Sequence, residues 1–258
     1  SRAAGKSRRR RHWGARSVSF IPFLGRKNNG AGDNSAGKPG VCAALDVGSA
    51  KTVCFIAKVE QGAGEISALD IVENAKAAGD TAPDFDLAKY GGGRGSLDGY
   101  LAKGPLVLTF YRGVWCPYCN LQLKEYDDRL SEITDLGATL VAVTPEKPNA
   151  YDILKEAGVQ EEILAEAATN VGFDVLYDEG NTLARDLGII FELPKTHQNV
   201  LTDIGIDIEV LTGNTTFGFA DPATYVIGQD KKIVKAFVPN NYRKRCEVDM
   251  ITAALKSI

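Results

Sequence analysis

The feature that most constrains the fold is a strand–helix–strand pattern over residues 105–144, with two cysteines at its first junction. Residues 105–111, PLVLTFY, are almost all apolar, as expected for a strand buried on both faces of a sheet. Residues 139–144, TLVAVT, are a second such strand. Between them a helix is predicted from Pro117 to Gly137, because apolar residues recur at steps of four and three: Cys119, Leu123, Tyr126, Leu130 and Ile133. The segment predicts a right-handed βαβ unit.

The chain that follows predicts an α/β fold with a mixed sheet. We expect a helix over 148–168, a strand over 174–178, a helix over 181–187, a hairpin of 223–228 with 233–238, and a closing helix over 246–256. Residues 192–220 are expected to hold a helix and an irregular insertion. Parallel strands followed by an antiparallel hairpin are typical of the three-layer sandwich of the thioredoxin type.

The N-terminal segment differs in composition from the rest of the chain. Residues 1–27 carry nine Lys or Arg and no Asp or Glu, so the formal net charge of −3 leaves −12 for the remainder. Residues 25–40 are rich in Gly, Asn and Ser. We predict a disordered basic arm over 1–40, which is usually a solvated tail. Only Trp13 and Phe20 lie near its arginine run, so nucleic acid is not expected as a partner.

Residues 41–75 are predicted to form a three-stranded β-meander. This stretch resembles the opening of the actin-like ATPases, most closely the bacterial cell-division actin homologue, through Asp46, Gly48, Ser49 and Lys51. The resemblance implies a phosphate-binding hairpin, but nothing downstream supplies a second phosphate hairpin or an adenosine pocket. We therefore interpret 41–75 as an orphaned or fused fragment. One hypothesis makes it, with the basic arm, the docking part of a localised adaptor.

The number and the positions of the cysteines limit the roles that they can have. The chain of 258 residues has five cysteines, and an odd number without a signal peptide argues against a secreted disulfide scaffold. Cys42 and Cys54 lie in the predicted meander and are expected to be small core residues. Every apolar run is interrupted before the length of a membrane span, which predicts a cytoplasmic protein. The Arg-rich, acid-free start is also typical of an organellar transit peptide, so targeting stays open.

The pair Cys116 and Cys119 is predicted to be a redox dithiol. Zinc needs about four ligands, and a second C-x-x-C is absent, so no metal is expected. At a helix N-terminus the dipole and the unpaired N–H groups stabilise a thiolate, and Pro117 suits the first helical position. Arg112 is either a nearby positive charge or a surface cation, and Trp115 either shields the pair or belongs to the core.

The sequence Trp-Cys-Pro-Tyr-Cys is similar to the thioredoxin and glutaredoxin active sites. Its surroundings resemble the peroxiredoxin family (alkyl hydroperoxide reductase C/thiol-specific antioxidant), in its C-x-x-C subgroup, through DTAPDF at 80–85, LAKGPLVLTFYRG at 101–113 and ATYVIGQDKKIVKAFV at 223–238. The resemblance covers about residue 79 to the end and predicts a domain over 76–258. It implies no cofactor, a hydroperoxide or disulfide substrate, and a thiol donor such as thioredoxin or glutathione, with a homodimer left open.

Two departures from the family pattern bear on mechanism. The family places a Thr three residues before the attacking cysteine, where this chain has Cys116, and an Arg before the strand at 223, where it has Pro222. These departures favour disulfide exchange, and the resemblance to thioredoxins predicts that Pro222 is a cis-proline beside the dithiol. The main hypothesis is a thiol–disulfide oxidoreductase acting on disulfides or peroxides; the alternative is a peroxidase in which Cys119 attacks.

The attacking sulfur itself stays open, Cys116 by the thioredoxin pattern and Cys119 by the peroxiredoxin pattern. Two further residues of reactive type are given lesser roles. His197 is expected to be a solvated surface residue, and Cys246 is a remote second candidate for resolving an oxidised Cys119.

Overall fold

The computed structural model describes residues 40–47, 52–59, 75–158, 170–193, 195–215, 217–239 and 242–258. The chain divides into two units, residues 1–62 and 63–258, which are described separately. In the first unit, β1 (Gly40–Val47) and β2 (Thr52–Val59) pair antiparallel, as two strands of the predicted meander would. The third predicted strand, the phosphate loop at 48–51 and the basic arm up to residue 39 lie outside the described residues. The domain boundaries and the actin-like fragment stay predictions.

The second unit is built on a seven-stranded mixed sheet. Its strands are β3 (Asp86–Lys89), β4 (Arg94–Ser96), β5 (Leu106–Phe110), β6 (Thr139–Thr144), β7 (Asp174–Tyr177), β10 (Thr224–Ile227) and β11 (Ile233–Phe237). They are ordered β11–β10–β5–β6–β7–β3–β4. The central β5, β6 and β7 are parallel, and the remaining pairs are antiparallel. The predicted mixed sheet with a C-terminal hairpin is confirmed.

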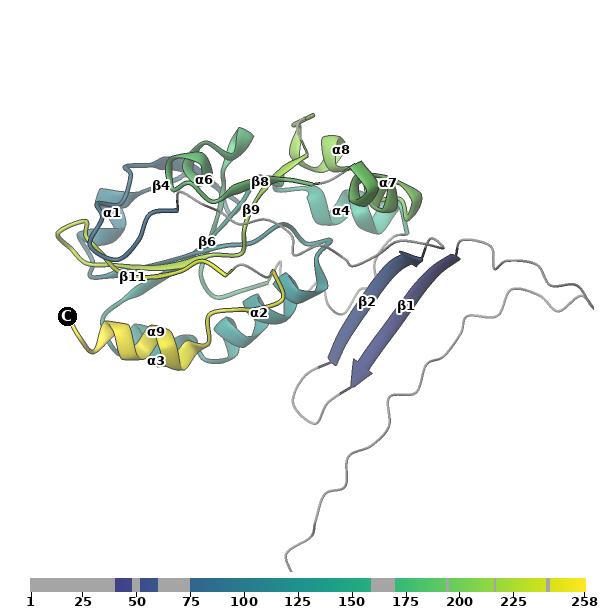
Figure 1. Ribbon diagram of the computed structural model, residues 1–258. Helices are drawn as coiled ribbons and strands as arrows, with labels where there is room; N and C mark the ends of the chain where they lie inside the picture. The colour runs from purple at the N-terminus through teal and green to yellow at the C-terminus, as the bar shows by residue number, and fades with distance from the viewer. Residues whose placement is uncertain are drawn as a thin grey trace, which may run out of the picture. The chain divides into compact units, whose positions relative to one another are not determined.

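Helices cover both faces of this sheet. The helices are α1 (Leu97–Leu101), α2 (Pro117–Asp128), α3 (Leu130–Thr134), α4 (Ala150–Glu156), α6 (Thr182–Asp186), α7 (Lys195–Asp203), α8 (Ile208–Thr212) and α9 (Val248–Leu255). Figure 1 shows α2, α3 and α9 along one face, with α1 and α6 on the other. The unit is therefore the three-layer α/β sandwich expected from the sequence.

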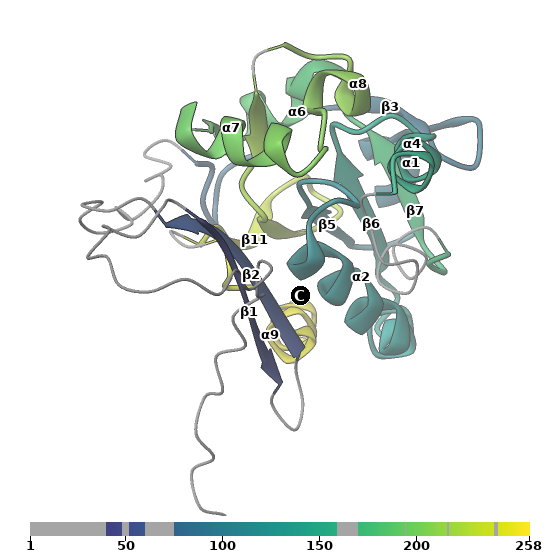
Figure 2. The ribbon, with the colours of Figure 1, turned by 90° about the vertical axis from the view of Figure 1, so that its right-hand side faces the viewer.

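The alternation of side chains along β5 explains the two halves of the core. Successive residues of a strand point to opposite faces. Val107 packs with Tyr126 of α2 and Ile251 of α9, whereas Leu106 and Leu108 pack in the cluster that includes α1. All residues of β5 are buried, which accounts for its almost entirely apolar sequence. Figure 2 shows α2 and α9 next to each other on their common face.

Two regions differ in detail from the expected elements. The helix after Pro117 ends at Asp128, because Arg129 leaves helical geometry (φ −115°, ψ 17°), and α3 follows as a separate short helix. Residues 192–220 are more regular than expected: α7 and α8 are followed by β9 (Gly218–Ala220), which pairs with β8 (Ile190–Glu192). Strands of three residues are too short to show a periodic pattern in the sequence.

The remaining expected helices are shorter than predicted. In the region expected to be helical over 148–168, α4 is followed by Gly158 at φ +66°, and residues 159–169 lie outside the described part. The closing helix α9 begins at Val248 rather than Cys246. No helix in the described ranges is long and apolar enough to cross a membrane.

Candidate active site: two buried thiols at a helix start

The two cysteines lie where β5 passes into α2. Cys116 is the N-cap of α2, in extended geometry, and Pro117 is the first helical residue. The backbone N–H groups of Cys119 and Asn120 both donate to the carbonyl of Cys116, at 2.9 and 3.1 Å. Proline suits the first position because it has no N–H to leave unpaired. Both cysteines are free thiols, 3% and 0% exposed, so the pair is inside the protein.

Hydrogen bonds fix the loop before the pair on two sides. The Asn120 side-chain amide donates to the carbonyl of Val114 at 2.8 Å, and the Val114 N–H donates to Oε2 of Glu146 at 2.6 Å. Gly113 has φ +149° and lies so close to Glu146 that a Cβ would be 2.3 Å from its carboxyl carbon. Only glycine fits there, for both reasons. The loop is therefore held between α2 and the residue that follows β6.

Two arginines bring positive charge to the thiols. Nη2 of Arg245, from the segment before α9, donates to Sγ of Cys119 at 3.5 Å. Arg112 is 8% exposed, and its guanidinium lies 4.7 Å from the ring centroid of Phe191 and 4.3 Å from that of Tyr242. Stacking between two rings holds the buried cation in place. Arg112 is thus a buried cation of this site and not a surface one.

The surroundings separate the two thiols in acidity. Burial alone raises the pKa of Cys119, but the Cys116 thiol, the Arg245 charge and the Arg112 backbone and charge outweigh it and lower that pKa to about 6. The pKa of Cys116 is raised well above its usual value, first by the hydrogen bond to Cys119, then by burial and the thiolate charge. At neutral pH the pair is therefore a Cys119 thiolate that accepts a hydrogen bond from a Cys116 thiol.

The Asp221–Pro222 peptide bond is trans, so the predicted cis-proline is wrong. Pro222 is buried just before β10, and the N–H of Ala223 donates to the carbonyl of Asp221 at 2.6 Å. This three-residue turn uses the φ that proline fixes, and it needs no cis bond. Its role is to shape the entry of the strand.

The other candidate residues have different surroundings, and not all of them belong to the cluster that holds the pair. Trp115 is half-buried and packs edge-on against Phe219, with ring centroids 5.4 Å apart, in the same apolar cluster as both cysteines. Cys246 belongs to another cluster, with Val107 and Tyr126, and burial raises its pKa to about 12. His197 falls within α7, and its side chain lies outside the described residues.

Sequence reasoning missed Arg245, Tyr242 and Glu146. The first two lie in YRKRC, residues 242–246, a short basic run ahead of a helix, which has no pattern of its own. Glu146 follows a buried strand and precedes two further polar or proline residues, which is typical of a surface turn. Their positions depend on how the C-terminal segment and β6 pack against α2, a long-range property that no local spacing encodes.

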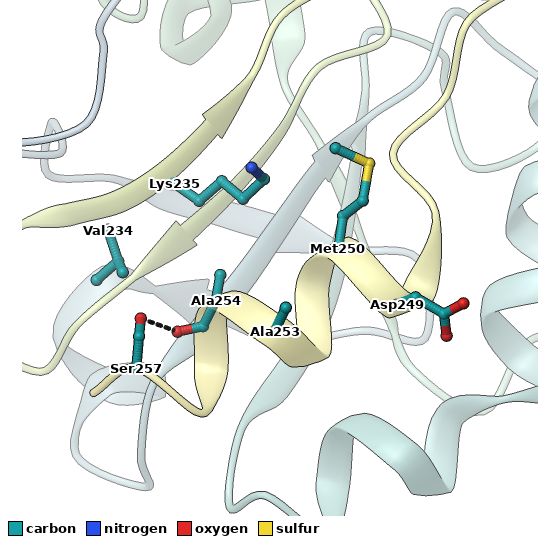
Figure 3. A pocket seen from close by; sticks show the side chains of 7 residues that line it. All are labelled: Val234, Lys235, Asp249, Met250, Ala253, Ala254 and Ser257. Atoms are coloured by element: carbon teal, nitrogen blue, oxygen red, sulfur yellow. Dashed lines mark hydrogen bonds between the residues drawn. The ribbon is translucent and has the colours of Figure 1, made fainter.

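No group of three or more His, Cys, Asp or Glu side chains suited to a metal occurs among the described residues. A hollow of about 500 Å³ lies between β11 and α9, and Figure 3 shows the side chains that line it: Val234, Lys235, Asp249, Met250, Ala253, Ala254 and Ser257. None of the cysteines or arginines of the thiol site lines this hollow.

Comparison with known proteins identifies the family. The AhpC/TSA family model matches residues 78–236. The chain belongs to the AhpC/TSA family. Two curated peroxiredoxins of Mycobacterium tuberculosis, from strains CDC 1551 / Oshkosh and H37Rv, are each 32% identical over 79 residues, 31% of this chain and 50% of each relative. The matched region thus spans about half the length of these curated relatives.

Solved structures agree with the fold of the family. Peroxidoxin BcpB from Mycobacterium tuberculosis has a TM-score of 0.50 at 20% identity, covering 70% of this chain and 97% of that one. A cysteine-to-serine mutant of peroxiredoxin 6 of Arenicola marina has a TM-score of 0.53 at 16% identity, covering 70% and 73%. AhpC of Mycobacterium tuberculosis has 0.51 at 14%, covering 71% and 93%. The AhpC/TSA fold is confirmed, and the C-x-x-C subgroup stays a prediction.

Proposed function

We propose that this AhpC/TSA protein is a thiol-dependent peroxidase in which Cys119 attacks a hydroperoxide and Cys116 resolves the product. The observation that carries the proposal is the asymmetry of the pair. Cys119 accepts a hydrogen bond from the Arg245 guanidinium at 3.5 Å, and its pKa is lowered to about 6, whereas the pKa of Cys116 is raised. A thiolate is the nucleophilic form of cysteine, so the site favours Cys119.

The position of Arg245 also replaces a feature that the sequence lacks. The family pattern places an arginine where this chain has Pro222, which weakened the peroxidase hypothesis. Arg245 and Arg112 bring two guanidinium groups to the thiolate from other parts of the chain. Preorganised cations of this kind stabilise charge that develops on a peroxide as its O–O bond breaks. In this proposal the two arginines take the place of the missing arginine, while the place of the missing Thr is held by the Cys116 thiol.

The proposed cycle has two covalent steps. The Cys119 thiolate attacks the terminal oxygen of the hydroperoxide, so an S–O bond forms, the O–O bond breaks, and the alkoxide leaves and takes up a proton. The Cys116 thiol then attacks the Cys119 sulfenic acid; an S–S bond forms and water leaves with the thiol proton. Two equivalents of an external thiol reduce the disulfide again. Both sulfurs are covered, so entry of the peroxide requires local movement of side chains.

A disulfide reductase is the second candidate, because two free thiols separated by two residues at a helix start also suit disulfide exchange. With the same acidity order, Cys119 would again attack and Cys116 would resolve. The thioredoxin-type order, with Cys116 attacking, needs a Cys116 thiolate, and the raised pKa of Cys116 opposes it.

As part of the proposal, the electron donor is a thiol such as thioredoxin or glutathione, the protein is cytoplasmic, and the assembly is a homodimer.

Mass spectrometry after one equivalent of hydroperoxide tests the proposal. The wild-type chain is expected to form a Cys116–Cys119 disulfide. Cys116→Ser is expected to complete one turnover and stop with a sulfenic acid on Cys119, trapped by dimedone. Cys119→Ser is expected to consume no peroxide, like the double variant. A sulfenic acid on Cys116 in the Cys119→Ser protein, or peroxide consumption by the double variant, contradicts the proposal.

A further inference from the structure

Glu146 is a buried carboxyl group directly behind the loop that carries the thiols. It follows the C-terminal end of β6 and is 0% exposed. Its Oε2 accepts the hydrogen bond from the Val114 N–H, and its Oε1 has no hydrogen-bond partner among the residues that the structure describes. Burying a carboxyl group with one oxygen unpartnered costs free energy. Holding the loop does not explain this cost, because a neutral amide would accept the same hydrogen bond.

The carboxyl group is coupled to the attacking sulfur. It lies against Gly113, three residues before Cys116, and accepts the hydrogen bond of Val114, two residues before Cys116, so it contacts the loop that leads into the thiol pair. Burial, followed by the negative charge of Cys119, raises the pKa of Glu146 to about 8 against the opposing hydrogen bond from Val114. Two groups that would both be negative cannot easily ionise together in a buried site.

The other titratable groups around Glu146 do not take this role. The Tyr90 hydroxyl, after β3, donates to the Glu146 backbone carbonyl at 2.7 Å, and Tyr111, after β5, is fully buried beside it. Burial raises the pKa of both tyrosines far above the usual value, so they stay protonated. Lys147 donates away from the site, to the carbonyl of Val210 at 3.0 Å. Arg112 and Arg245 act on the thiols.

We infer that Glu146 is the proton reserve of the thiol pair: it keeps its proton while Cys119 is a thiolate and gives it up when Cys119 is oxidised. The inference rests on the proposed function for its place in the peroxide cycle. It assigns a proton-donor role: Glu146 gives its proton to the leaving alkoxide, and the charge on Cys119 sets when it holds that proton. One negative charge then stays in the buried site throughout, on sulfur in the reduced state and on the carboxylate in the oxidised state.

The proton balance of the cycle follows from this exchange. When the Cys119 thiolate attacks the hydroperoxide, the leaving alkoxide needs one proton, and Glu146 supplies it and becomes a carboxylate. In the resolving step the carboxylate accepts the Cys116 proton and returns it to the departing hydroxide, which leaves as water. When two external thiols reduce the disulfide, one of their protons returns to Glu146 and Cys119 becomes a thiolate again.

Infrared difference spectroscopy of reduced against diamide-oxidised protein at pH 7 tests the proton itself. The reduced wild-type chain is expected to show a protonated-carboxyl C=O band that disappears on oxidation. Glu146→Gln removes that band, and Glu209→Gln, which changes an exposed side chain on α8, leaves it in place. A wild-type difference spectrum without the band, or a band that survives in Glu146→Gln, overturns the inference. Because diamide replaces the peroxide, this result does not depend on peroxidase activity.

The pH profile of a single peroxide turnover separates a proton reserve from a merely structural residue. The wild-type rate is expected to rise through about pH 6 and to fall above about pH 8, as Cys119 and then Glu146 lose their protons. In Glu146→Gln the fall above pH 8 disappears and the rate at pH 7 drops at least about tenfold, since positioned proton donors typically contribute about 10²- to 10⁴-fold. Glu146→Asp restores part of the rate and the alkaline fall.

One outcome would contradict the inference alone, and another would contradict the proposed function alone. A Glu146→Gln protein that is slower by one factor at every pH, with the fall above pH 8 retained, shows a structural role and overturns the proton reserve. A wild-type protein that consumes no hydroperoxide, yet loses the carboxyl band on diamide oxidation, refutes the peroxidase and leaves the proton coupling intact.

Discussion

Cys119 and Cys246 are equally buried and chemically opposite. They are 0% and 2% exposed, yet the pKa of Cys119 is lowered to about 6 while that of Cys246 is raised to about 12. Burial raises the pKa of both. The difference comes from what else surrounds each sulfur. Cys119 has the Cys116 thiol and two arginines, whereas Cys246 packs with apolar residues of β5, β10 and α9, and the nearby charges of Lys235 and Glu247 act on it in opposite directions.

The contrast shows that burial raises the pKa of both thiols, and that only at Cys119 do the Cys116 hydrogen bond and the two arginines outweigh it. Arg245 makes the point sharply, because it is the neighbour of Cys246 in the sequence but donates to Cys119. The two side chains point in different directions, so Arg245 reaches the α2 site and Cys246 packs in the core. Function here depends on the direction of a side chain rather than on proximity along the chain.

The largest expected effect is the difference in reactivity between these two cysteines. At pH 7 the pKa values of about 6 and about 12 imply thiolate fractions that differ by roughly five orders of magnitude. Iodoacetamide is therefore expected to label Cys119 with a midpoint near pH 6, rising with pH, and to leave Cys246 unlabelled at pH 7. Peptide mass spectrometry measures both sites in one sample. Equal labelling of the two cysteines would remove the basis for choosing Cys119 as nucleophile.

Removing Arg245 is expected to reduce the difference in reactivity between Cys119 and Cys246. Arg245→Met replaces the arginine with a long side chain that has no charge. Loss of a close opposite charge shifts a pKa by about 1–3 units. The labelling midpoint of Cys119 should rise accordingly, and the rate of peroxide consumption at pH 7 should fall about tenfold to a hundredfold. Lys244→Met, one residue earlier on an exposed side chain, is the matched control. An unchanged midpoint in Arg245→Met would place the source of the acidity in Cys116 and Arg112.

The sequence predicts the fold well where buried strands are long. β5 and β6 are almost entirely apolar runs, as buried central strands are, and the C-terminal hairpin is marked by its turn at 229–231. The C-x-x-C pair could also be placed at a helix start from local pattern alone, since Pro117 suits the first helical position.

The parts that could not be predicted all depend on contacts between distant segments. Which cysteine ionises depends on Arg245, which is 126 residues away from Cys119 in the chain. The cis-proline prediction failed because Pro222 satisfies its backbone with a tight trans turn, and proline alone does not specify the isomer. The burial of Glu146 has no signal in the sequence, because it comes from the contact with the loop at Gly113 and Val114, which belongs to another part of the chain.

The smallest expected effect is that of replacing Cys246, the unreactive cysteine of the two. Cys246→Ala removes one buried sulfur and should cost about 1 kcal/mol of unfolding free energy, since the apolar cluster around it stays closed. Cys246→Ser should cost more, about 1–3 kcal/mol, because it places a hydroxyl in the same surroundings. Urea denaturation measures both. Neither variant should change the labelling midpoint of Cys119 or slow peroxide consumption more than about twofold, because both keep Arg245 and the apolar cluster around Cys119. A loss of turnover in Cys246→Ala with unchanged stability would make Cys246 a working thiol, and the division into one reactive and one inert buried cysteine would be wrong.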